Sequence, residues 1–68
     1  MRRKAKDIIG HNILYYCPLS QTEYKAWVVN EIDDQMVQVQ VEGTTEGVYR
    51  YISLGQIKEV YDLPPMNL

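Results

Sequence analysis

The chain lacks phenylalanine, and its 68 residues include one cysteine and one histidine. A single cysteine excludes an internal disulfide, and an unpaired thiol fits a reducing compartment such as the cytoplasm. Free cysteine is commonly a small buried side chain, so we expect Cys17 to be buried rather than reactive. No apolar run is long enough to cross a membrane as a helix, and DIIGHN after the basic start is not a signal-peptide core. We therefore expect a cytoplasmic protein without membrane contact.

Catalytic and metal-binding signatures are also lacking. His11 and Cys17 are two potential metal ligands without a third or fourth at the usual spacing. No nucleophile, base and orienting group occur together. Asp33 and Asp34 are predicted as a turn rather than a carboxylate pair, and residues 42–47, EGTTEG, lack the lysine and following helix of a phosphate loop. The sequence therefore predicts a protein that is not an enzyme and uses no metal or cofactor.

Basic residues are scarce outside the first seven positions. Residues 1–7 hold four basic residues and one acidic residue, whereas the rest of the chain holds three basic and eight acidic ones. This distribution predicts a flexible basic arm before an acidic body. The arm could contact phosphates through Arg2, Arg3, Lys4 and Lys6. The alternative is a solvated, frayed terminus.

Strand patterns dominate the body. In residues 36–42, MVQVQVE, valine alternates with polar residues, and such alternation separates an apolar face of a strand from a polar one. We therefore predict inward-pointing side chains at Val37, Val39 and Val41. The same parity argument predicts inward positions in the two flanking strands for Tyr24, Ala26, Val28 and Ile32, and for Val48 and Ile52.

Shorter elements complete the predicted domain. A first strand within residues 7–17 should end at Pro18, because proline cannot donate a hydrogen bond to the ladder. One turn of 3₁₀ helix at residues 53–56 should place Leu54 and Ile57 together on the core. The remaining assignments are turns at 33–35 and 42–47, a last strand at 57–61 and a proline-containing tail at 62–68.

Five strands with a 3₁₀ turn before the last one resemble the SH3-like small barrel, most closely its Tudor branch. The resemblance covers residues 8–61. It is carried by Tyr24-Lys25-Ala26-Trp27-Val28, Ile32, Val37-x-Val39, Glu46 to Ile52, and Leu54-x-x-Ile57. It implies an all-β fold, a five-stranded SH3-like barrel of Tudor type with a 3₁₀ turn before the last strand.

The resemblance also implies a ligand groove, in which the family cages a methylated lysine or arginine by cation–π attraction. On this template the groove residues are Tyr15, Tyr16, Tyr24, Glu42 and Glu46. The chain departs from the family pattern because its turn at 42–47 contributes no aromatic ring. The alternative is that Tyr15 and Tyr24 complete the core.

Parity predicts a second candidate surface, an exposed apolar stripe across three strands. If the valines of residues 37–41 point inward, the outward-pointing residues are Trp27, Val29, Met36, Tyr49 and Tyr51. A patch of this kind usually marks a partner surface, although a β-bulge would change the parity. Arg50 has the inward parity and should either reach the rim of the barrel or pair with a glutamate.

Two functional hypotheses follow. The first is a non-enzymatic binding module, a small adaptor or regulator, that engages a protein partner or a basic peptide segment through the stripe or the groove. Homodimer formation through the stripe is a variant of it. The alternative is an RNA- or DNA-binding regulator, whose arm contacts phosphates while barrel aromatics stack on bases. The sequence does not identify the partner.

Overall fold

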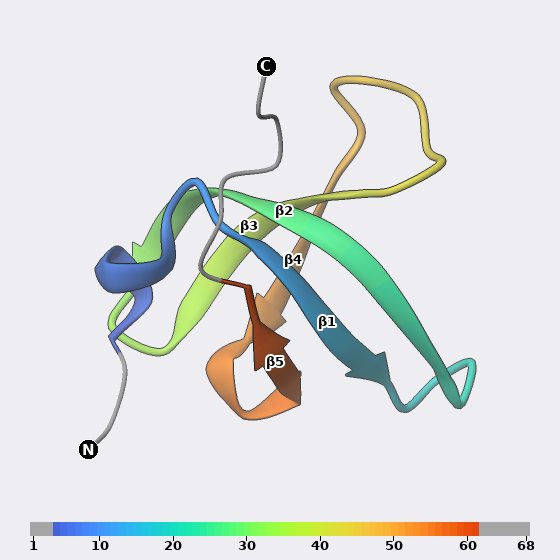
Figure 1. Cartoon of the computed structure of the whole chain (residues 1–68), viewed down its shortest axis with the longest axis horizontal. Helices are drawn as coiled ribbons and strands as arrows, with labels where there is room; N and C mark the ends of the chain where they lie inside the picture. Colours follow the sequence, from blue (N-terminus) through green and yellow to red (C-terminus); the bar gives the residue numbers. More distant parts are fainter. Residues whose placement is uncertain (1–3, 62–68) are drawn as a thin grey trace.

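The computed structural model describes residues 4–61 of the chain. These residues form two short 3₁₀ helices and five strands (Figure 1). In chain order the elements are η1 (Ala5–Ile8), β1 (Asn12–Cys17), β2 (Thr22–Asp33), β3 (Met36–Val41), β4 (Tyr49–Ser53), η2 (Leu54–Gln56) and β5 (Ile57–Val60). The predicted five strands, and the predicted 3₁₀ turn before the last of them, are confirmed.

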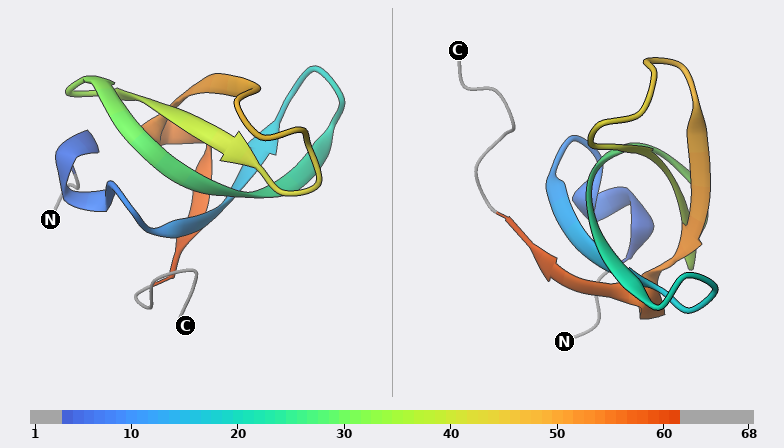
Figure 2. Two further views of the ribbon diagram at one scale, coloured as in Figure 1. Left: turned by 90° about the horizontal axis from the view of Figure 1, so that it is seen from above. Right: turned by 90° about the vertical axis from the view of Figure 1, so that its right-hand side faces the viewer.

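All five strands belong to one antiparallel sheet in the order β4-β3-β2-β1-β5. The first four strands follow the chain as a meander, and β5 returns to pair with β1. The sheet curls strongly around its inner face (Figure 2). It is not closed into a barrel, because β4 and β5 remain its two edges.

The core lies on the inner face of the curled sheet. Val37, Val39 and Val41 are all buried there, which confirms the parity predicted for β3. Leu54 and Ile57 pack against the core from η2 and β5 as predicted. The fully assembled core consists of Ala5, Ile8, Ile13, Tyr15, Ala26, Val28, Val37, Val39, Val41 and Ile52.

The core also takes in Ala5 of the predicted arm, next to Ile8. Ala5 is fully buried, and Ile8 is 2% exposed. The backbone N–H of Ala5 donates a hydrogen bond to the carbonyl of Asp34 in the turn between β2 and β3. The packed part of the chain therefore begins at η1, before the predicted boundary at residue 8.

Two predicted core positions are wrong. Ile32 is 50% exposed and Val48 is 51% exposed. The pairing of β2 with β3 shifts register between Val28 and Asn30 and again between Glu31 and Asp33. An extra residue at each shift breaks the simple alternation of faces, so the parity of Tyr24 does not extend to Ile32. Val48 precedes β4 and belongs to the loop.

The long β3–β4 loop is held by one side chain of β3. The Nε2 group of Gln40 donates to Thr44 Oγ1 at 2.8 Å and to the carbonyl of Thr45 at 3.0 Å. The backbone N–H of Gly47 in turn donates to Gln40 Oε1 at 3.1 Å. Gly47 has a φ of +90°, which other residues rarely adopt. These bonds fix the loop beside the outer face of the sheet.

Candidate binding surface

The outer face of the sheet carries a row of aligned residues. Trp27 of β2 lies opposite Asn12 of β1 and Gln40 of β3, and Gln40 lies opposite Tyr49 of β4. The backbone N–H of Tyr61, directly after β5, donates to the carbonyl of Asn12 at 2.9 Å. Trp27 is therefore central in the row, and its side chain is 46% exposed.

The first hollow of the outer face lies on the β3–β4 side of Trp27. It has a volume of about 420 Å³, and its apolar lining includes Ile9, Trp27, Val29 and Tyr49. Glu46, from the loop held by Gln40, lines it as well. The residue after η1 and residues of β2 and β4 thus surround one depression.

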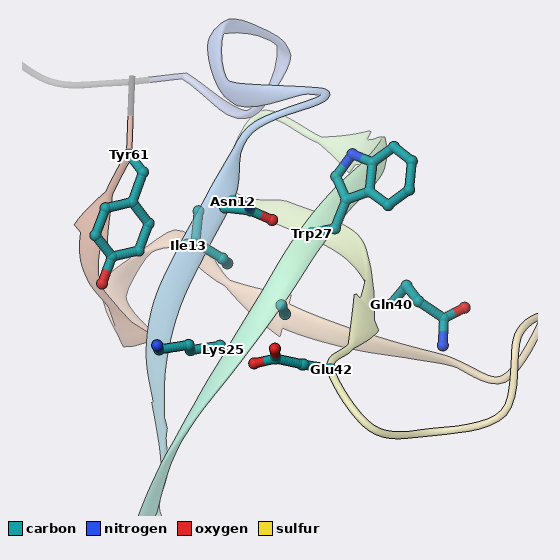
Figure 3. A pocket seen from close by; sticks show the side chains of 8 residues that line it. Asn12, Ile13, Lys25, Trp27, Gln40, Glu42 and Tyr61 are labelled. Carbon is teal, nitrogen blue, oxygen red and sulfur yellow. The ribbon is translucent and has the colours of Figure 1, made fainter. Parts of the chain in front are cut away.

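The second hollow lies on the β1–β5 side of Trp27 and has a volume of about 610 Å³. Trp27 and Tyr61 lie on opposite sides of it, with Lys25 and Glu42 toward one end (Figure 3). Partial desolvation and the neighbouring Glu59 carboxylate raise the pKa of Tyr61. Because Trp27 lines both hollows, its indole is the shared wall of the surface.

The structure brings part of the predicted stripe together. Trp27, Val29 and Tyr49 line the first hollow. Tyr51 is 59% exposed, but it lies opposite Gln38, further along β4. Met36 is half-buried at the far end of β3, where it pairs with Ser53 of β4.

Among the large exposed apolar residues of this surface, sequence reasoning missed Ile9 and Tyr61. Ile9 lies in the connection between η1 and β1, so strand parity gives no signal for it. Tyr61 ends the predicted last strand, and an aromatic residue in that position was an available signal.

The predicted tyrosine groove is wrong as a single surface. Tyr15 is 2% exposed and belongs to the core, and its ring centroid is 5.7 Å from that of Tyr24. Tyr16 has the opposite parity on β1, because neighbouring strand residues point to opposite faces; its ring lies 5.9 Å from Lys58 Nζ. The alternative, in which Tyr15 and Tyr24 complete the core, describes the structure.

The two glutamates of the predicted groove lie elsewhere. Glu42 lines the second hollow of the outer face and Glu46 the first. Neither lines the inner hollow that contains Tyr15. Burial of Tyr15 raises the pKa of its phenol, and Arg50 acts in the opposite direction.

Arg50 and Cys17 both line a third hollow, at one end of the inner face. Arg50 is exposed although it lies opposite the buried Val39, which fits the predicted position at a rim. Cys17 is half-buried rather than fully buried. Hydrogen bonds from the backbone and side chain of Ser20 lower the pKa of its thiol.

The basic arm is described only in part. Lys4 and Lys6 are exposed, and the backbone N–H of Lys4 donates to Asp7 Oδ2 at 3.3 Å. Arg2 and Arg3 lie outside the described residues. The histidine has a structural partner, because His11 Nδ1 donates to the carbonyl of Tyr61 at 2.8 Å.

Within residues 4–61, no three side chains of histidine, cysteine, aspartate or glutamate lie close enough to hold a metal ion. Neither of the helices in that segment has the length and apolarity needed to cross a membrane. Compared with models of protein families, with curated proteins and with solved structures, the chain matches none of them.

Proposed function

We propose that the protein is a non-enzymatic binding module that engages a protein partner through the outer face around Trp27. The observation that carries this proposal is the convergence of Ile9, Trp27, Val29 and Tyr49 on one hollow. Large apolar side chains that remain this exposed on a small domain typically form a contact surface. Tryptophan and tyrosine are also the side chains that most often dominate binding energy.

The charges around the surface favour a partner segment that combines an apolar anchor with basic residues. Glu46 lines the first hollow, and Glu42 lines the second beside Lys25. Carboxylates placed next to an apolar site attract a basic segment and orient it. They would repel phosphates, so nucleic-acid binding is the less favoured alternative.

We further propose that the domain is an open form of the SH3-like small barrel of Tudor type. The strand order, the curl of the sheet and the position of η2 before β5 support this assignment. The single cysteine supports a cytoplasmic location.

The first experiment asks whether the partner is a second copy. Light scattering on the wild type and on Trp27→Ala would give the molar mass of each. A wild-type dimer that becomes a folded monomer on substitution would identify the outer face as a self-interface. A monomer in both cases would leave the face available for another protein.

The second experiment measures affinity. Proteins retained by the immobilised wild type would be identified, purified and titrated against variants by calorimetry. Trp27→Ala should weaken binding by about 30-fold, the effect of losing a dominant interface residue. Ile32→Ala is the matched control, because Ile32 is similarly exposed but lines neither hollow of the outer face.

Two results would contradict the proposal. One is a partner that binds Trp27→Ala as tightly as the wild type. The other is binding to nucleic acid that falls steeply with salt and is lost when residues 2–6 are deleted, which would favour the alternative.

A further inference from the structure

The β4 strand forms one of the two open edges of the sheet, and β5 forms the other. Within the described residues β4 pairs with β3 alone, and its register has no shift. Tyr49, Arg50 and Tyr51 are exposed in succession. An edge strand directs alternate N–H and C=O groups away from its sheet, where another strand can pair with them. The regular ladder of β4 is therefore available for strand addition.

The inner hollow lies directly beside this edge. It has a volume of about 420 Å³, and four consecutive residues of β4, Tyr49 to Ile52, form one wall. Tyr15 and Cys17 of β1, and Leu19 of the following loop, line it from the other side. The hollow thus occupies the gap that the curled sheet leaves open.

The chemistry of the hollow selects an occupant. Among its lining residues in the described chain, Arg50 alone carries a formal charge. Arg50 and Ile52 lie opposite Val39 and Val37, both buried, so these two side chains share the inner face of β4. A guanidinium pairs with a carboxylate through two parallel hydrogen bonds. An added strand would need an acidic residue and, two positions away, an apolar one.

We propose that the free edge of β4 accepts an extended acidic peptide segment of a partner protein. The backbone of the segment pairs with β4, one carboxylate contacts Arg50, and an apolar side chain covers Ile52. This surface shares Tyr49 with the first hollow of the outer face, but Trp27 does not line it. A second copy is a poor occupant, because two-fold pairing of β4 strands would bring both Arg50 side chains onto one short ladder, where like charges repel.

The test uses a synthetic probe, the acetylated and amidated peptide TETVTET. Its glutamate and valine side chains share one face when the peptide is extended, in either strand direction. Titration into the ¹⁵N-labelled full chain should shift the backbone amides of β4. It should also slow alkylation of Cys17, the single thiol, because the peptide covers the hollow.

Two comparisons isolate the carboxylate contact. The glutamine peptide TQTVTQT should bind the wild type about tenfold more weakly than TETVTET does. TETVTET should likewise bind the Arg50→Gln variant about tenfold more weakly than it binds the wild type. Lys58→Gln is the matched control, because it removes one positive charge from the other edge strand; it should bind like the wild type. Arg50→Lys, which retains the charge but not the planar fork, should give an intermediate affinity.

A third comparison isolates the backbone contact. In an extended peptide, alternate residues direct their N–H groups to opposite sides. N-methylation of the residues whose N–H groups face β4 should abolish binding of TETVTET. N-methylation of the other residues should not. Trp27→Ala should leave the peptide affinity unchanged, so the result is independent of the proposed function.

The proposal is overturned by any of three results. The first result is that the β4 amide signals do not shift at millimolar peptide. The second is that TETVTET and TQTVTQT bind equally well. The third result is a protein that forms dimers in which β4 amides and Cys17 are already protected without peptide, which would assign the edge to a second copy.

Discussion

Ser20 contacts two functional groups of neighbouring strands. Its hydroxyl lies 3.1 Å from the Tyr24 hydroxyl, and its hydrogen bonds lower the pKa of the Cys17 thiol. Because the thiolate rather than the thiol is the nucleophile, a lowered pKa moves the rise in reactivity to lower pH. The turn after β1 therefore favours the thiolate form of Cys17 at a lower pH than in an ordinary thiol.

Removal of the Ser20 hydroxyl should raise the pKa of Cys17. For Ser20→Ala, the curve of alkylation rate against pH should move to higher pH, since one hydrogen bond to the thiolate is lost while the backbone bond remains. Iodoacetamide labelling followed by mass spectrometry measures this rate. Ser53→Ala, a serine in β4, serves as the control and should leave the curve in place. Superimposable curves for Ser20→Ala and the wild type would contradict the assignment.

Individual residues show how far the sequence predicts the structure. The predicted positions of Val37, Val39 and Val41 are correct because β3 carries one strict alternation and pairs with β4 without a register shift. The family template groups Tyr15 with Tyr16, yet adjacent residues of a strand point to opposite faces. Ile9 of the candidate surface was missed because its position depends on how η1 packs, and no local pattern encodes that packing.

At the scale of elements, β2 determines where sequence prediction fails. It is twelve residues long and pairs with both β1 and β3. Its first half obeys simple parity, which placed Ala26, Trp27 and Val28 correctly. The register shifts begin after Val28, and side-chain pattern alone does not reveal where a strand accommodates an extra residue. Ile32 is exposed for this reason.

The turn between β2 and β3 depends on one carboxylate. Asp33 Oδ1 accepts hydrogen bonds from the backbone N–H groups of Gln35 at 2.8 Å and Met36 at 3.0 Å. Asp33→Ala should lower the free energy of unfolding by about 1–2 kcal/mol, because two backbone donors lose their partner. Urea denaturation followed by Trp27 fluorescence measures the change.

The adjacent aspartate provides the control for this turn. Asp34 contributes its backbone carbonyl to Ala5, which substitution of its side chain does not remove, so Asp34→Ala should have a smaller effect. Asp33→Asn retains an acceptor oxygen and should keep most of the stability. Equal losses for Asp33→Ala and Asp34→Ala would show that the side-chain bonds do not stabilise the turn.

For the whole molecule, η1 completes a core that is otherwise open at one end. A chain of this size buries only about 60% of its unfolded surface, so each buried side chain matters. Ile8→Ala should lower the free energy of unfolding by about 2–5 kcal/mol, because a fully buried side chain is truncated. That loss is a large part of the total free energy of unfolding of a small domain. Thermal unfolding of Ile8→Ala should therefore begin near room temperature.

The neighbouring isoleucine separates stability from binding. Ile9 is 40% exposed and lines the first hollow of the outer face. Ile9→Ala should therefore unfold within a few degrees of the wild type in a thermal melt. It should nevertheless bind the outer-face partner more weakly. A large loss of stability in Ile9→Ala, or none in Ile8→Ala, would show that the two side chains have been assigned to the wrong faces.

The return of β5 to β1 has a consequence for the order of folding. The hairpins β1–β2, β2–β3 and β3–β4 join segments that are close in the chain, so each can form early from local contacts. The pair Ile13 and Val60 joins segments from nearly opposite ends of the described chain, and closing so long a loop is slow. During synthesis the domain therefore acquires its final strand pairing only after β5 has left the ribosome.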